Sequence, residues 1–287
     1  MELKHTATRA GRLSSFLKEE MAMSTGLVNR LKWQDKLFVN GVPQHTDYPV
    51  QPGDVITVPL DEPTPEYPPE AGELTVLFED DHILAVDKPA GMLIHPSRAT
   101  MTGTLANRVI AYYQKTGQKC AFHPITRLDR DTFGIVLLAK NAHVHALLNQ
   151  LHSDGKLQKT YHALVFGGPD EDSGIIDAPI ARRPLPSLLR YVNREGKPSL
   201  TEFAVLSRQT HTALLQLRPI TGRTHQLRVH CAYMGYPIMG DPQYGTPESQ
   251  KLSVQLGFTH QQLCATQLGF LHPITGKPLC FRSKMKL

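Results

Sequence analysis

The segment DEPTPEYPPEAGE at residues 61–73 constrains the fold of this chain more than any other feature. It holds four prolines and five acidic residues, and it has no basic residue. Proline lacks a backbone N–H and has a fixed φ, so such a segment can neither continue a helix nor pair well within a sheet. We therefore expect a linker at 61–73 between a small domain at 1–60 and a large domain at 74–287.

The net charge of +5 is distributed unevenly over the 287 residues. Residues 1–60 have 7 basic and 6 acidic side chains, a net charge of +1, whereas residues 74–287 have 24 basic and 15 acidic side chains, a net charge of +9. A basic excess on the large domain can attract a polyanion such as RNA. A solvated surface that serves only solubility explains the same excess equally well.

The chain has no feature of a membrane or secreted protein. Its longest apolar runs are far too short to span a bilayer, and its N-terminal residues form no signal-peptide core. We expect a cytoplasmic protein without a membrane partner. The cysteines are widely spaced and form no CxxC pair, so we expect reduced structural thiols. They are Cys120, Cys231, Cys264 and Cys280.

Residues 1–60 have the pattern of a compact α/β module. The run RLSSFL and the apolar positions Leu27, Val28 and Leu31 predict two short helices. Asn40-Gly41 is typical of a tight hairpin turn, and VQPGDVITVPL predicts a turn followed by a strand.

The large domain is richer in strands than in helices. Two β-rich runs that break at 79–82 are followed by a Lys-Pro-Ala-Gly loop, and GIVLLAKN predicts a buried strand. Asn141 can cap a helix at 142–153, and Gly235 can end a second helix. The tail LCATQLGFLHPITGKPLCF predicts a hairpin. The expected fold class is α+β, with a largely antiparallel mixed sheet preceded by the small α/β module.

Polar and charged residues crowd at predicted strand ends in the ranges 123–132, 159–161 and 218–230. Loops carried by rigid strands are common places for catalytic groups. Taken alone, the alternating charges around Asp129 fit a salt-bridged turn better than a catalytic loop. The arginines and histidines of 218–230 fit a site for an anion, either a phosphate or a carboxylate.

Two histidines five residues apart also allow a metal-dependent hydrolase, with Asp129, Asp131, His225 and His230 as ligands. We disfavour this alternative because positions i and i+5 do not share a helix face, and because the neighbouring arginines would repel a cation. The chain also lacks the nucleophile, phosphate-loop and dinucleotide motifs of acyl transfer and nucleotide chemistry.

Several motifs together resemble the RluA family of pseudouridine synthases, and they cover nearly all of 74–287 in the family's order and spacing. Residues 10–60 resemble the alpha-L RNA-binding module that is often fused ahead of this family. The family motifs are ILAVDKPAGMLIHPS at 83–97, TRLDRDTFGIVLLAKN at 126–141, KTYHALVFG at 159–167, LRPITGRTHQLRVHCAYMGYPIMGDPQYG at 217–245 and LGFLHPITG at 268–276.

The resemblance implies an isomerase that converts uridine to pseudouridine in RNA and needs neither a cofactor nor a metal. It assigns the catalytic carboxylate to Asp129, the cation that keeps this carboxylate ionised to Arg223, and an aromatic ring that stacks on the uracil to Tyr161. Whether the carboxylate attacks the sugar, attacks the base or removes a sugar proton stays open.

The resemblance also suggests residues that contact RNA. Arg127 is expected to contact or replace the displaced base or to bind a phosphate, Lys88 to bind the RNA backbone, and Arg228 to bind RNA within the anion site. Three positions depart from the usual family pattern and leave the target undecided. They are Thr126, Phe133 and Cys264.

We expect the substrate to be structured RNA, with large-subunit ribosomal RNA ahead of transfer RNA, and the protein to be a monomer. The alternative is a non-catalytic RNA-binding or ribosome-assembly factor that retains the fold.

Overall fold

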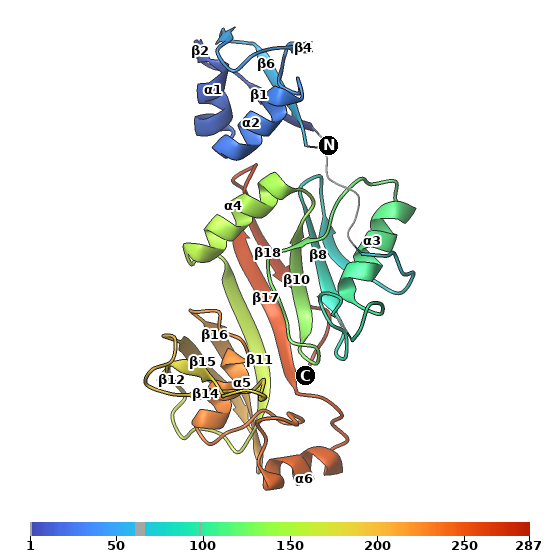
Figure 1. The fold of residues 1–287 in the computed structure, drawn as a ribbon. Helices are drawn as coiled ribbons and strands as arrows, with labels where there is room; N and C mark the ends of the chain where they lie inside the picture. Colours follow the sequence, from blue (N-terminus) through green and yellow to red (C-terminus); the bar gives the residue numbers. More distant parts are fainter. Residues whose placement is uncertain (1, 61–66, 98) are drawn as a thin grey trace.

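The computed structural model describes residues 2–60, 67–97 and 99–287 (Figure 1). Residues 2–60 form the module at the top of Figure 1, with a four-stranded sheet in the order β1-β6-β3-β4 and a second strand pair, β2 with β5. The elements of the module are β1 (Glu2–Thr6), β2 (Gly11–Arg12), α1 (Leu13–Ser15), the π-helical turn that follows it (Phe16–Glu20), α2 (Thr25–Trp33), β3 (Phe38–Val39), β4 (Val42–Pro43), β5 (Pro49–Val50) and β6 (Val55–Pro59).

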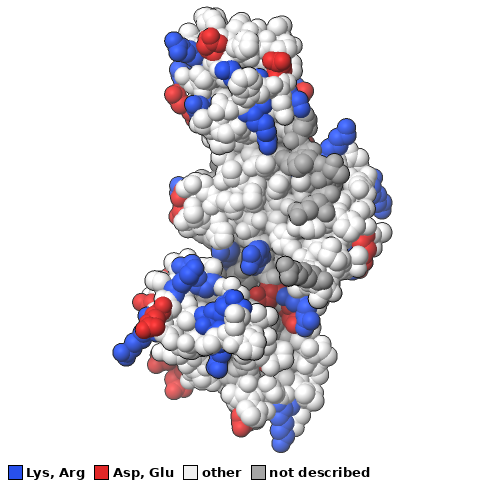
Figure 2. All heavy atoms as spheres, in the orientation of Figure 1, with Lys and Arg blue, Asp and Glu red and all other residues white. Residues whose placement is uncertain are grey.

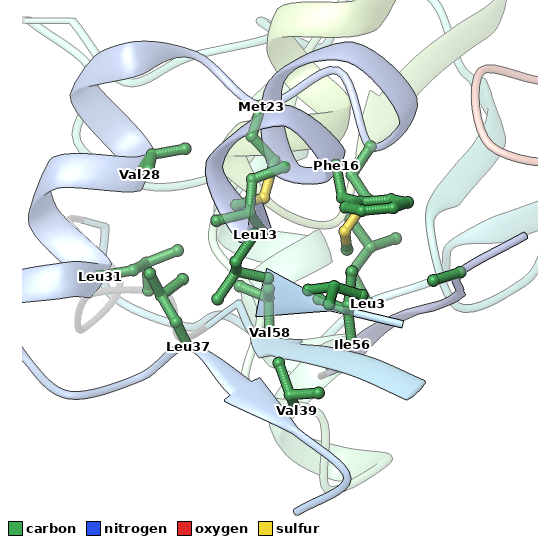
Figure 3. Close-up of a cluster of buried hydrophobic side chains, with 14 of the residues drawn as sticks. Leu3, Leu13, Phe16, Met23, Val28, Leu31, Leu37, Val39, Ile56 and Val58 are labelled. Atoms are coloured by element: carbon green, nitrogen blue, oxygen red, sulfur yellow. The ribbon is translucent and has the colours of Figure 1, made fainter. Parts of the chain in front are cut away.

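The module has its own hydrophobic core, because its helices pack against one face of its sheet (Figure 3). Phe16 and Leu13 on the first helical segment and Ile56 and Val58 on β6 are fully buried there. The predicted Asn-Gly turn joins β3 to β4, with Asn40 at φ 51° and Gly41 at φ 81°. Both predicted helices are confirmed. The strand β1, which pairs with β6, was not predicted from the sequence.

The large part of the chain is built on a ten-stranded sheet. Its main path runs β12-β15-β16-β11-β17-β10-β8-β7, while β18 pairs with β17 and β9 pairs with β10. The elements are β7 (Thr75–Glu79), β8 (Ile83–Lys88), α3 (Leu105–Lys115), β9 (His123–Pro124), β10 (Phe133–Ala139), α4 (Ala142–Ser153), β11 (Gln158–Phe166), β12 (Ser173–Asp177), β13 (Ile180–Arg182), β14 (Arg190–Val192), β15 (Leu200–Arg208), β16 (Thr212–Pro219), α5 (Gln226–Tyr233), α6 (Pro247–Gln255), β17 (Leu263–Leu271) and β18 (Pro278–Arg282).

Helices cover both faces of one half of this sheet, which explains the nearly continuous apolar runs of β8 and β10. Leu84 and Val86 of β8 pack in the cluster that includes α3, whereas Ile83 and Ala85 pack in the cluster that includes α4. Successive side chains of a strand point to opposite faces, so a strand buried on both faces is apolar throughout. This half of the sheet forms the rigid base from which the loop with Asp129 emerges.

The other half of the sheet, formed by β11, β16, β15 and β12, lies in the lower part of Figure 1 with α5. The two halves meet where β11 pairs with β17; the next pair along the sheet, β17 with β10, forms a parallel junction, whereas the other pairings are antiparallel. Gly134 makes this junction possible. Its φ is +105°, and a Cβ added there would stand 2.3 Å from the backbone oxygen of Ala265.

Most predicted elements are confirmed: the hairpin of β7 and β8, the buried strand β10, helix α4 capped by Asn141, the end of α5 before Gly235, and the hairpin of β17 and β18. The α+β class with a largely antiparallel sheet is also confirmed. Helices α3 and α6 were not predicted. All four cysteines are free. No helix among residues 2–60, 67–97 and 99–287 has the length and apolar character to cross a membrane.

Only part of the predicted linker can be described, because residues 61–66 lie outside the described residues. The remainder, 67–73, is docked on the large part of the chain. Tyr67 contacts the ring of Phe122 edge-on, and the side chain of Asn107 on α3 donates a hydrogen bond to the backbone oxygen of Pro68. The domain boundaries at 60 and 74 stay a prediction, although the core of the module and the cores of the large sheet are separate clusters.

Candidate active site

Asp129 lies in a loop that leads into β10, and several buried contacts fix this loop. The ammonium of Lys88 donates a hydrogen bond to the backbone oxygen of Arg130 at 2.9 Å. The hydroxyl of Thr126 accepts a hydrogen bond from the backbone N–H of Leu137 at 3.0 Å, and the buried side chain of Gln261 donates one to the hydroxyl of Thr132. The catalytic candidate therefore sits on a loop that is anchored on both sides.

The carboxylate of Asp129 is held by Arg228, from the first turn of α5. Nη1 of Arg228 donates a hydrogen bond to Oδ2 of Asp129 at 3.1 Å. The same guanidinium binds Asp241 through two hydrogen bonds, from Nε at 2.7 Å and from Nη2 at 2.8 Å. Such a two-point contact fixes both the position and the plane of a guanidinium group. Asp241 and Arg228 thus form a buried support on which Asp129 rests.

Tyr244 and His225 complete this support. The ring of Tyr244 packs against the guanidinium of Arg228, with 4.9 Å from Cζ to the ring centroid, and its hydroxyl lies 2.8 Å from Nδ1 of His225. The same hydroxyl accepts a hydrogen bond from the backbone N–H of Arg190. The other ring nitrogen of His225, Nε2, lies 3.9 Å from the Asp129 carboxylate.

Burial lowers the pKa of His225, against the opposing effect of Asp129, and Arg228 lowers it further. The imidazole is therefore neutral near pH 7. With two carboxylates, one guanidinium and a neutral imidazole, the cluster retains one net negative charge, and Asp129 is its acidic member on the cavity. The side chain of Asp129 is 29% exposed, whereas that of Asp241 is fully buried.

Tyr161 on β11 faces the same cavity as Asp129. Burial raises the pKa of Tyr161, and the Asp129 carboxylate raises it further, so the hydroxyl stays protonated at neutral pH. The cavity has a volume of about 360 Å³, within the size range of small-ligand sites. Of the described residues that line it, Asp129 alone is acidic.

The chain is similar to known proteins. A model of the RNA pseudouridylate synthase family matches residues 82–233 of this chain. The chain belongs to the RNA pseudouridylate synthase family. It is accordingly an isomerase that converts uridine to pseudouridine in RNA. The family match begins at residue 82, so the alpha-L identity of the N-terminal module stays a prediction.

Two relatives and one solved structure illustrate the similarity. An uncharacterized RNA pseudouridine synthase of Bacillus subtilis is 38% identical over 87% of this chain and 82% of its own length. The ribosomal large subunit pseudouridine synthase C of Vibrio cholerae is 32% identical over 93% of this chain and 87% of its own length. The human RNA pseudouridylate synthase domain containing 1 protein shares the fold, with a TM-score of 0.62 and 23% identity over 77% of this chain and 92% of that one.

The position of Arg223 in this synthase differs from the expected one. Arg223 lines the cavity, but its Nε donates a hydrogen bond to the backbone oxygen of Pro198, and the guanidinium that contacts Asp129 belongs to Arg228. The reason is the start of α5: Arg223 lies in the exposed loop before the helix, whereas Arg228 lies on its buried face. The contact with Asp129 that was predicted for Arg223 is therefore made by Arg228, which is only 4% exposed and is occupied by carboxylates rather than available to RNA.

Lys88 also departs from its expected role. Its side chain is fully buried, and its ammonium donates hydrogen bonds to the backbone oxygens of Pro89, Met92 and Arg130, each at 2.9 Å. It cannot contact an RNA backbone from this position. Burial lowers the pKa of Lys88 to about 8. Lys88 thus stabilises the loop that presents Asp129.

Arg127 is exposed and lines the cavity with Asp129, as expected for alternate residues of an extended segment. Only two of the four ligands of the alternative hydrolase, Asp129 and His225, lie close together. Asp131 pairs with Arg130, and His230 bonds to Thr201 and to the backbone oxygen of Ala178.

The three departures from the family pattern all lie in buried supports of the loop. Thr126 anchors the loop to β10, Phe133 contacts the ring of His260 edge-on, and Cys264 pairs with Phe133 across the parallel junction. Three supporting residues received no role from the sequence: Asp241, Tyr244 and Gln261. His225 was considered as a metal ligand and as part of the anion site, not as a support of Asp129.

Proposed function

We propose that this synthase isomerises uridine in large-subunit ribosomal RNA and that Asp129 is its catalytic carboxylate. The observation that carries the second part is the position of Asp129: it is the sole acidic residue among the described residues lining the cavity, and Arg228 fixes its direction. For the first part, two relatives carry the name ribosomal large subunit pseudouridine synthase. They are C of Vibrio cholerae and D of Nitrosomonas europaea, the latter 37% identical over 75% of this chain and 63% of its own length.

The reaction breaks the bond between C1′ of the ribose and N1 of the uracil, and forms a bond between C1′ and C5. The proton on C5 is lost, and N1 gains a proton. Breaking a glycosidic bond builds positive charge on the sugar, which a carboxylate can stabilise or capture. Asp129 is the group placed to do either, because its neighbours at the cavity are neutral or cationic.

Tyr161 and Arg127 are proposed to contact the target nucleotide. An enzyme that acts on a nucleobase must take it out of its stack and hold it in a pocket. The ring of Tyr161 can stack on the uracil, and its neutral hydroxyl can donate a hydrogen bond at the base. Arg127 is exposed at the same cavity, so it can contact the displaced base or the neighbouring phosphate.

The N-terminal module is proposed to bind RNA as well. The alignment with the Vibrio cholerae enzyme covers 93% of this chain, a larger share than residues 74–287, so it extends into the module. An added RNA-binding surface would help select a site within a large RNA, because the catalytic cavity holds little more than one nucleotide.

The experiment that tests this proposal uses unmodified transcripts labelled with tritium at uridine C5. Purified protein should release tritium from a large-subunit ribosomal RNA transcript and release much less from pooled transfer RNA transcripts, with and without chelator. Release from transfer RNA alone would contradict the proposed target. No release from either RNA would contradict the proposed activity and favour an RNA-binding or assembly factor.

A further inference from the structure

A second cavity adjoins the one that holds Asp129. It has a volume of about 630 Å³ and lies among the end of α4, the start of β11 and the loop that follows β16. The two cavities share lining residues, so they form one continuous recess. The shared residues include His152, Lys159, Thr221, Gly222 and Arg223.

The second cavity is cationic. Lys159, Arg218 and Arg223 line it, and none of the described residues that line it is an Asp or a Glu. The nearby carboxylate of Asp154 is engaged by Gln150 and Lys156. Figure 2 shows Lys and Arg side chains gathered around the hollowed waist of the molecule, between the part with α4 and the part with α5. A recess lined by one sign of charge concentrates ions of the opposite sign.

Lys159 is the most buried of the three cations that line the second cavity. Its ammonium lies 3.0 Å from Nε2 of His152, and no carboxylate contacts it among the described residues. Burial lowers the pKa of His152, and Lys159 lowers it further, so the imidazole is neutral and accepts the hydrogen bond. Burial also lowers the pKa of Lys159. A half-buried ammonium without a counter-ion is costly, and an incoming anion would relieve that cost.

Gly222 lies beside this pair of side chains. A Cβ added at Gly222 would stand 3.9 Å from Nζ of Lys159 and 4.0 Å from Nε2 of His152. Arg223, the next residue, uses its Nε for the backbone oxygen of Pro198, and no carboxylate contacts its guanidinium among the described residues. Two cations that line the second cavity, Lys159 and Arg223, thus have no carboxylate partner among the described residues.

We propose that this second cavity is a phosphate subsite that binds the RNA backbone phosphate beside the target uridine, with Lys159 as its direct ligand and Arg223 as a second one. The proposal rests on the proposed function in RNA. It adds the phosphate group of the substrate through which the protein binds the target nucleotide. Neutral His152 orients the ammonium without cancelling its charge. A phosphate bound here would place the attached ribose at the shared wall of the two cavities, next to Asp129.

The first test measures the affinity of the full chain for the large-subunit ribosomal RNA transcript between about 50 and 200 mM salt. Lys159→Met should weaken binding and should make the slope of log K against log salt less steep by about 0.7 to 0.9. Lys159→Arg should keep the slope. The matched control is Lys156→Met, which removes an exposed lysine outside both cavities and should leave the slope unchanged.

An unchanged slope in a folded Lys159→Met variant would overturn the proposal, and so would an equal loss of slope in Lys156→Met. A fall in the saturating rate without a change in affinity would instead make Lys159 a group of the chemical step. A second measurement needs no variant: calorimetry of wild type with uridine 3′,5′-bisphosphate and with uridine. The bisphosphate should bind at least about tenfold more tightly, and equal affinities would overturn the proposal.

These binding measurements are independent of turnover. If neither RNA releases tritium while the slope still falls in Lys159→Met, the assigned activity fails and the phosphate subsite stands. If tritium is released and the slope does not change, the activity stands and the subsite fails.

Discussion

Arg228 and Lys159 line the same recess, and they differ in how their charge is balanced. Arg228 is buried between two carboxylates, and the hydrogen bonds that its side chain makes to described residues go to Asp129, Asp241 and Gln243. Lys159 has a neutral histidine as its partner and no carboxylate among the described residues. A cation whose hydrogen bonds are satisfied by the protein orients protein groups, whereas a cation left without a counter-ion is available to a ligand. Arg228 therefore supports the catalytic carboxylate, whereas Lys159 is available to bind RNA.

The largest expected effect in this comparison is on stability. Arg228→Met removes the partner of fully buried Asp241, and leaving one member of a buried ion pair uncompensated costs about 3 to 5 kcal/mol. Lys159→Met removes a cation that lacks a carboxylate, so its cost should be below about 1 kcal/mol. Urea unfolding of both variants measures the free energies. Equal losses of unfolding free energy in the two variants would contradict this distinction between Arg228 and Lys159.

The double variant Arg228→Met with Asp241→Leu sharpens this prediction. It removes the uncompensated carboxylate together with its partner, so it should recover a large share of the stability lost in Arg228→Met. It should not recover activity, because Asp129 would still lack its support. A double variant as unstable as the single one would show that the loss comes from packing rather than from charge.

A smaller effect concerns Lys88 and pH. The pKa of Lys88 falls from its ordinary 10.5 to about 8 in the folded chain because the ammonium is buried. Below pH 8 both states hold the proton and the folded state bears the cost of the buried charge. Between pH 8 and 10.5 only the unfolded chain holds the proton, so this residue's contribution to stability rises with pH by up to about 3 kcal/mol.

The matched comparison is wild type against Lys88→Met by urea unfolding at pH 7.5 and at pH 10.5. The free energy of unfolding of wild type, relative to that of Lys88→Met, should be higher at pH 10.5 than at pH 7.5. A difference that does not depend on pH would mean that Lys88 is not the cause.

The smallest expected effect is on RNA affinity, and it compares the N-terminal module with the large part of the chain. Deleting residues 1–66 removes the module but keeps Tyr67 and Pro68 docked on the large part. The affinity for ribosomal RNA should fall by about tenfold, with a smaller dependence on salt, while the large part stays folded. Filter binding and thermal melting measure the two quantities. Deletion of residues 1–73 should lower the melting temperature further, because the contacts of Tyr67 are lost.

An unchanged affinity after deletion of residues 1–66 would contradict an RNA-binding role for the module. A collapse of the large part after that deletion would instead show that the module is structural. Ile274, from the connection between β17 and β18, packs against the core of the module and is one contact through which such an effect could act.

The sequence predicts much of the fold because local signals are strong there. Asn141 caps α4 as expected, Asn40-Gly41 forms its turn, and the apolar run of β10 is buried on both faces. Helix α3 was not predicted, although its first turn has a capping box between Thr104 and Asn107. The three-residue spacing of these two side chains is a local signal for the start of a helix. Strand β1 was missed because a single one of its five residues is buried.

The site was predicted less completely, because the contacts that define it connect distant segments. Motifs identified Asp129 and Tyr161, and the structure brings both to one cavity. They could not show which of two arginines, five residues apart, reaches Asp129, since that depends on where α5 begins and which face it buries. The counter-ion Asp241 lies 13 residues beyond Arg228, and no local pattern links the two.

The most direct measurement of the central claim is single-turnover tritium release by Asp129→Asn, with Asp131→Asn as the matched control. Both variants remove one carboxylate from the same loop, but Asp131 pairs with Arg130 and does not line the cavity. We predict that Asp129→Asn releases tritium at least about 10³-fold more slowly than wild type, while Asp131→Asn stays within about tenfold. Activity of Asp129→Asn close to that of Asp131→Asn would contradict the assignment of Asp129 as the catalytic carboxylate.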